Sequence, residues 1–177
     1  MTALLPTPGQ TVGPFFGYAL PFPDDEHLVP PGTPGAVRLH GTVYDGHGDP
    51  VPDAIIELWQ ADADGGVVQR PGSLRRDGHT FTGWGRASTD RAGHYSFTTV
   101  TPGAPFFALT VLARGLLNRL FTRAYLPEAA DDPFLVGVDV DRRSTLLATR
   151  DQTGYVFDVR LQGEGETVFL AYPRHQP

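Results

Sequence analysis

The strongest constraint on the fold is a series of short segments in which apolar and polar residues alternate, each bounded by glycine, proline or aspartate. Val37, Leu39 and Val43 fall on one side of an extended chain, and the polar residues between them fall on the other. The same period of two recurs in 95–99 and 155–161. Short strands separated by turn signals predict an all-β sandwich or barrel, with little helix.

Further segments complete this pattern. Apolar runs fill 54–61 and 106–113, and the first is apolar on both faces, so we expect it to be a central strand. Two more strands are expected over 119–126 and 167–172. The segments 127–135 and 139–149 each have room for one short helical turn.

The first 35 residues differ from the rest because prolines and glycines interrupt every stretch of apolar residues. Proline removes a backbone donor and disfavours the α region in the residue before it, so we expect an extended arm and not a helix. The arm nevertheless carries apolar groups such as Leu4, Val12, Phe16 and Phe22. We therefore expect residues 1–35 to pack on the body or on a partner chain, and residues 36–177 to form the sandwich.

Charge and composition exclude several classes of function. The net charge is −6, which argues against nucleic acid as a partner, and there is no cysteine for disulfides, zinc or thiolate catalysis. The six histidines show no ligand spacing, and no glycine-rich phosphate loop is present. No secretory signal or run of 18 apolar residues occurs, so we expect a soluble, cytoplasmic protein without a membrane span.

An ordered set of motifs resembles the intradiol dioxygenase family, from about residue 10 to the end of the chain. The matching segments are Gln10–Phe16, Gly41–Asp45, Ala54–Asp62, Gly85–Asp90, Thr101–Gly103, Ala113–Gly115, Thr122–Tyr125 and Gln162–Thr167. The late segments around Arg114 and Glu164 resemble the α subunits of the family's heteromeric members, which act on protocatechuate, more than their β subunits. The resemblance implies a β-sandwich of the intradiol dioxygenase type.

The resemblance also implies chemistry that this chain does not carry alone. Members of the family cleave a catechol ring with O2 at a ferric ion, Fe(3+), held by two tyrosinates and two histidines, a ligand set suited to that hard ion. Phe106 and Ala108 stand where the two histidines are expected, and the loop 67–79, around Ser73, has no tyrosine. We therefore expect no metal ligand and no catalytic residue here, with the iron bound by a β subunit in an αβ hetero-oligomer.

The same resemblance assigns this chain part of the substrate pocket. Gly13 and Pro14 in the arm would let the ligand approach the backbone closely. Arg114 would hold the carboxylate of an aromatic substrate by charge-assisted bonds. The expected reaction converts protocatechuate to 3-carboxy-cis,cis-muconate.

Two other interpretations stay open from the sequence. One is a single-chain enzyme with an unusual iron site built from the six tyrosines: Tyr18, Tyr44, Tyr95, Tyr125, Tyr155 and Tyr172. The other is a β-sandwich binding module without any part in catalysis, because this architecture serves many functions.

Overall fold

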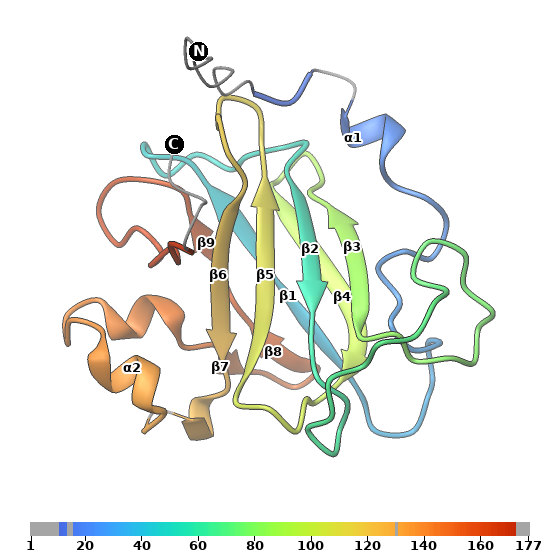
Figure 1. Ribbon diagram of the computed structural model, residues 1–177. Coiled ribbons are helices and arrows are strands. Elements are labelled where there is room, and N and C mark those ends of the chain that lie inside the picture. Colours follow the sequence, from blue (N-terminus) through green and yellow to red (C-terminus); the bar gives the residue numbers. More distant parts are fainter. Residues whose placement is uncertain (1–10, 14–15, 130, 173–177) are drawn as a thin grey trace, which may run out of the picture.

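The protein folds as two facing β-sheets, which confirms the predicted all-β sandwich (Figure 1). The computed structural model describes residues 11–13, 16–129 and 131–172. One sheet has the order β4-β1-β8-β7, with β9 also paired to β1, and the other has the order β3-β2-β5-β6. The strands are β1 (Ala36–Tyr44), β2 (Ile55–Trp59), β3 (Trp84–Ser88), β4 (His94–Val100), β5 (Phe106–Leu112), β6 (Leu120–Tyr125), β7 (Thr149–Arg150), β8 (Gly154–Val156) and β9 (Val159–Arg160).

The core lies between the sheets because alternate side chains of each strand point inward. Leu39 of β1, Phe97 of β4 and Phe107 of β5 are fully buried. Each such side chain contributes roughly 1.5–3 kcal/mol through burial. The predicted strand 54–61 is shortened to β2, which lies inside its sheet between β3 and β5, as expected for a segment that is apolar on both faces.

Two strand predictions need correction, and one strand was not predicted. The strand expected over 155–161 is split into β8 and β9, because the Asp158 side chain accepts from Thr42 N at 2.8 Å and interrupts the ladder. Gly41 permits this close approach, since a Cβ there would lie 1.9 Å from the Phe157 carbonyl oxygen. Residues 167–172 form no strand, although Leu170 N donates to Phe121 O at 2.7 Å. The sequence also missed β3, in which Gly85 interrupts the apolar pattern.

Helical turns occur in both predicted segments, with two and not one in the first, and they lie together beside one end of β6 (Figure 1). They are η1 (Pro127–Ala129), α2 (Pro133–Gly137) and η2 (Arg143–Leu146). Asp132 caps α2 by accepting from Phe134 N at 2.9 Å, and Pro133 occupies the first turn, where it loses no hydrogen bond.

The described part of the N-terminal segment runs beside β3 and differs from the expected arm in one respect (Figure 1). A single helical turn, α1 (Phe16–Ala19), interrupts the extended path, and Leu20 N donates to Phe16 O within it. Leu28 is buried against Gly85, and its backbone N donates to Thr98 O at 2.8 Å. The division into an arm of residues 1–35 and a body of 36–177 stays a prediction.

Candidate functional site

Arg114 stands where β5 ends, in a turn that the local sequence dictates. Ala113 is buried, and Leu116 N closes the turn by donating to Ala113 O at 3.3 Å. Gly115 takes φ +92°, a conformation that glycine adopts without steric cost. The turn places the Arg114 side chain 53% exposed at the rim of the sandwich, where its Nη2 lies 3.1 Å from Asp53 Oδ2.

The arm passes over the same turn. The Thr11 hydroxyl oxygen accepts from Gly115 N at 2.7 Å, and Gly13 follows two residues later, exposed, with its carbonyl accepting from Phe16 N. A Cβ on Gly17 would lie 3.7 Å from Asp53 Cβ. The fold therefore brings Gly13 and Arg114 to one end of the sandwich. Pro14, the third predicted site residue, lies outside the described residues.

The opposite end of β5 holds Phe106 and Ala108 in an apolar setting. Their side chains point away from the core between the sheets, into which Phe107 and Leu109 point, and Phe106 packs against a smaller cluster with Tyr125. The Phe106 ring lies 5.2 Å from that of Tyr125, and the Arg123 guanidinium carbon lies 4.1 Å above it. Arg123 Nη1 also donates to the Tyr125 hydroxyl at 2.9 Å. Aromatic rings and one arginine thus fill this end of the strand.

Comparisons with known proteins agree along nearly the whole chain. A family model described as "Dioxygenase" matches residues 12–130. The protocatechuate 3,4-dioxygenase α chain of Burkholderia cepacia is 38% identical over 96% of this chain and 99% of its own length. The β chain from the same organism is 31% identical, over 74% of this chain and 66% of its own. This chain belongs to the intradiol dioxygenase family.

Solved structures agree with this family assignment. The dioxygenase domain of a dioxygenase–carbohydrate-binding fusion from Streptomyces sp. SirexAA-E superposes with a TM-score of 0.55 at 25% identity. The superposition covers 89% of this chain and 99% of that one. The sandwich is therefore the fold of this family, as the motifs predicted.

The residues present do not fit the iron centre typical of intradiol dioxygenases. Within 11–13, 16–129 and 131–172, no three His, Asp or Glu side chains gather as a metal ion would require. The hydroxyls of the buried tyrosines are already engaged: Tyr95 donates to Phe157 O at 2.6 Å, and Tyr155 lies 3.3 Å from the Thr101 hydroxyl. Burial also raises the pKa of Tyr95 and of Tyr125, so both are neutral phenols in the folded chain.

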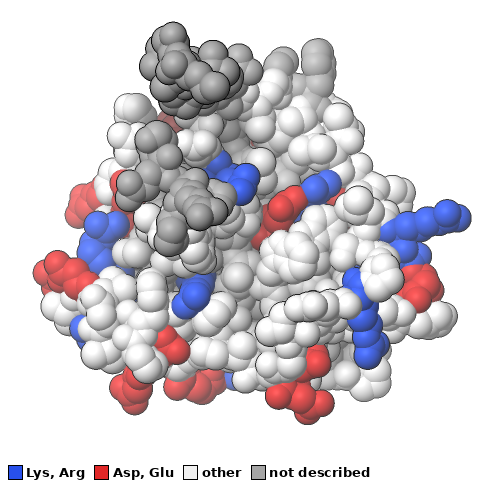
Figure 2. Space-filling model, in the orientation of Figure 1, with Lys and Arg blue, Asp and Glu red and all other residues white. Residues whose placement is uncertain are grey.

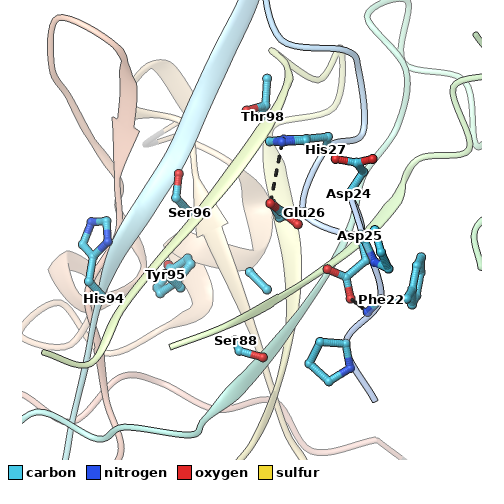
Figure 3. A pocket seen from close by; sticks show the side chains of 13 residues that line it. Phe22, Asp24, Asp25, Glu26, His27, Ser88, His94, Tyr95, Ser96 and Thr98 are labelled. Carbon is cyan, nitrogen blue, oxygen red and sulfur yellow. Dashed lines mark hydrogen bonds and ion pairs between the residues drawn. The ribbon is translucent and has the colours of Figure 1, made fainter. Parts of the chain in front are cut away.

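A groove of about 630 Å³ lies elsewhere, between the arm and β4 (Figure 3). Asp24, Asp25 and Glu26 line it, together with His27 and His94. Burial, with a smaller contribution from Glu26, raises the pKa of Asp25 to about 6 from its ordinary value of 3.8. Three carboxyl groups would repel an anionic aromatic ligand, and neither Gly13 nor Arg114 lines the groove. We therefore place the candidate site at Arg114 and not here.

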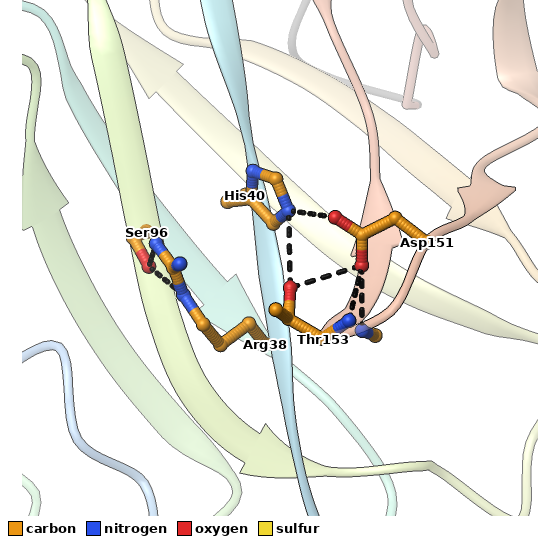
Figure 4. Close-up of polar contacts among 6 residues, drawn as sticks. Arg38, His40, Ser96, Asp151 and Thr153 are labelled. Atoms are coloured by element: carbon orange, nitrogen blue, oxygen red, sulfur yellow. Dashed lines mark hydrogen bonds and ion pairs between the residues drawn. The ribbon is translucent and has the colours of Figure 1, made fainter.

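A second polar cluster lies on the outer face of β1 and β4 (Figure 4). His40 Nε2 lies 2.9 Å from Asp151 Oδ2, and the His40 ring lies 5.7 Å from that of His94. Backbone N–H donation from Thr153, together with the His40 contact, holds the pKa of Asp151 well below its usual range. Arg38 donates separately to the Ser96 hydroxyl at 2.8 Å. The cluster anchors the turn before β8 to β1.

Sequence reasoning missed two residues at the candidate site, Asp53 and Thr11. Asp53 directly precedes the expected strand 54–61, and Thr11 lies in the expected arm. Each reaches its partner across the fold, 61 and 104 residues away along the chain. The dipeptide Pro52-Asp53 before a buried strand was a turn signal, but it carries no information about which cation the carboxylate meets.

Proposed function

We propose that this chain is the α subunit of protocatechuate 3,4-dioxygenase. One observation carries the proposal: the similarity to α chains spans 96% of this chain and 99% of the B. cepacia chain, whereas the β-chain match leaves a third of the relative uncovered. A second α chain, from Pseudomonas putida, is 39% identical over the same 96% of this chain. The replacement of the expected histidine pair by Phe106 and Ala108 agrees with a subunit that does not hold the metal.

In this proposal the chain binds and orients the substrate. Protocatechuate has a carboxylate opposite its two hydroxyls, and the exposed Arg114 guanidinium would hold it by charge-assisted hydrogen bonds. The backbone of Gly13 and Pro14 would form one wall of the pocket beside the substrate ring, since the arm is attached to Gly115 through Thr11. These contacts would fix the orientation of the ring before the reaction, which lowers the entropic part of the barrier.

The remainder of the site belongs to a protocatechuate 3,4-dioxygenase β subunit in this proposal. The β subunit would bind Fe(3+), which supports cleavage of the catechol ring by O2 to 3-carboxy-cis,cis-muconate. Two segments near Arg114 carry exposed apolar side chains: Tyr18 on α1 is 80% exposed, and Leu117 in the turn after β5 is 61% exposed. Exposed apolar groups rimmed by polar ones are typical of surfaces that a partner covers. We place the αβ hetero-oligomer in the cytoplasm.

No helix among the described residues is long and apolar enough to cross a membrane.

The middle of the β6-β5-β2-β3 face is mostly uncharged, and acidic side chains gather along its lower edge (Figure 2). An anionic ligand would therefore be attracted locally by arginines and not by the charge of the face as a whole.

The first test is expression of the chain alone and together with a candidate β subunit, with iron supplied. We expect a visible charge-transfer band and oxygen uptake with protocatechuate only in the copurified pair. A coloured, active chain on its own would support the single-chain alternative and would mean that Phe106 and Ala108 are wrongly aligned with the ligand positions.

The second test concerns Arg114 in the assembled pair. Arg114→Ala should raise the KM for protocatechuate about 10- to 100-fold, because a hydrogen bond to a charged group contributes about 1.5–3 kcal/mol. The KM for catechol, which has no carboxylate, should change little. Equal effects on the two substrates would contradict a carboxylate-binding role.

A further inference from the structure

Asp53 is the acidic partner of Arg114 at the candidate site. Its Oδ2 lies 3.1 Å from Arg114 Nη2, and the two side chains are 39% and 53% exposed. Among the described residues, no other hydrogen bond to the Arg114 guanidinium is found. A guanidinium carries five N–H donors, so one contact leaves the others available for a second carboxylate.

The turn that carries Asp53 is firmly anchored. Asp53 itself takes φ +63°, a conformation that aspartate and asparagine tolerate better than most residues. The Thr89 hydroxyl spans the turn on both sides, donating to Val51 O and accepting from Ala54 N, each at 2.8 Å. Ala54 is fully buried at the start of the interior strand β2. The carboxylate of Asp53 is therefore presented from a fixed point.

An arginine on the rim of a sandwich has many rotamers, and binding a ligand in one of them costs conformational entropy. An anchored carboxylate that already engages one edge of the guanidinium reduces that cost. Gly17 of α1 packs on the same aspartate, so the arm and the arginine are both placed relative to it. Asp53 thus lies where the arm, the β1–β2 turn and the end of β5 meet.

From these contacts we propose that Asp53 is a positioning residue for Arg114 and thereby increases the preference of the enzyme for carboxylated catechols. The inference rests on the proposed function, because it assumes that Arg114 receives the substrate carboxylate. It assigns Asp53 no contact with the reacting atoms.

The test uses the assembled αβ enzyme with two variants of Asp53. Asp53→Gly deletes the carboxylate at a φ that glycine adopts freely, so it avoids new backbone strain. It should raise the KM for protocatechuate about threefold, because exposed ion pairs contribute about 0.2–1 kcal/mol. The kcat for protocatechuate should not change, and neither should the kcat or the KM for catechol. Asp53→Asn keeps an oxygen acceptor at the same position. Its KM for protocatechuate should equal that of the parent enzyme or lie below it.

Two further variants separate the possible failures. In an Arg114→Ala background, Asp53→Gly should have no additional effect on the KM for protocatechuate, since the residue acts through Arg114. Glu128→Gln breaks a comparably exposed ion pair with Arg150, 2.6 Å long, and should leave the preference between the two substrates unchanged.

Suppose that Arg114→Ala impairs binding of protocatechuate more than that of catechol, but Asp53→Gly leaves the KM for protocatechuate unchanged or lowers it. This result would overturn the positioning role of Asp53 alone. An equal effect of Asp53→Gly on both substrates, or an effect that persists in the Arg114→Ala background, would overturn it as well. If Arg114→Ala itself shows no selectivity between the substrates, the proposed function of Arg114 fails, and the inference about Asp53 fails with it.

Discussion

The two ends of strand β5 occupy the same sheet, yet their surroundings differ completely. At the Phe106 end, rings from β6 and α2 cover the outward side chains: the Phe134 ring stacks on Tyr125 with centroids 6.3 Å apart, and Arg123 lies over Phe106. At the Arg114 end, the outward side chain is a half-exposed cation beside an exposed turn. Figure 1 shows the helical turns beside the first end and the arm near the second.

One end of the strand is thus closed by packed rings, whereas the other presents an exposed charge. Inward residues of β5, such as Phe107 and Leu109, build the core along its whole length. Outward residues are constrained only by what covers them locally. The Phe106 end is therefore expected to contribute mainly stability, and the Arg114 end mainly substrate recognition.

The largest effect is expected from Phe106→Ala. The substitution removes a ring that packs on Tyr125 and lies under Arg123, so the free energy of unfolding should fall by about 3 kcal/mol. Urea denaturation of the purified chain measures it. Arg114→Ala is the matched variant at the other end, and it should change the free energy of unfolding by no more than about 0.5 kcal/mol. Similar losses at both ends would show that the Arg114 end also contributes to stability.

A second, pH-dependent effect is expected on the arm. Asp25 is 4% exposed and accepts from Phe22 N, and its pKa is raised to about 6 in the folded chain. Well below pH 3.8 the Asp25 carboxyl is protonated in both the folded and the unfolded chain. Between pH 4 and 6 the unfolded chain ionises first, so the folded state loses stability as the pH rises. Asp25→Asn cannot ionise and should be more stable than the parent at pH 7 by on the order of 2 kcal/mol.

The gain from Asp25→Asn should fall to about 0.5 kcal/mol at pH 4, which denaturation curves at the two pH values would show. Asp24→Asn is the neighbouring control: it removes an exposed charge at a residue whose φ of +64° suits asparagine. A gain from Asp25→Asn that is the same at both pH values would contradict burial of an ionising carboxyl in the arm.

The smallest effect is expected from Thr11→Val, which removes the acceptor for Gly115 N and loosens the arm at the Arg114 end. This hydrogen bond is exposed and should contribute at the low end of the range of about 0.5–1.5 kcal/mol, so kcat/KM for protocatechuate in the assembled enzyme should fall about two- to threefold. Thr11→Ser keeps the hydroxyl and should behave as the parent. A loss of the same size for Thr11→Ser would show that the methyl group and not the hydrogen bond matters.

Much of the fold was predictable because its signals are local. The alternation in 37–43 and 95–99 led to β1 and β4, and the residues 127–149 contained the expected helical turns. The errors fell where a tertiary contact overrides local preference: Asp158 breaks the last strand by pairing with Thr42, and Gly85 in β3 makes room for Leu28 of the arm. Neither partner lies within the reach of a periodicity argument.

The sequence by itself determined the sandwich and the family, because strand period, turn chemistry and ordered motifs are properties of the chain as written. Only the tertiary structure decided that Arg114 meets Asp53, 61 residues away, and that the arm reaches Gly115 through Thr11. The physical reason is that hydrogen bonds and ion pairs act over a few ångströms of space. Segments distant along the chain come within that range only when the two sheets pack around their common core.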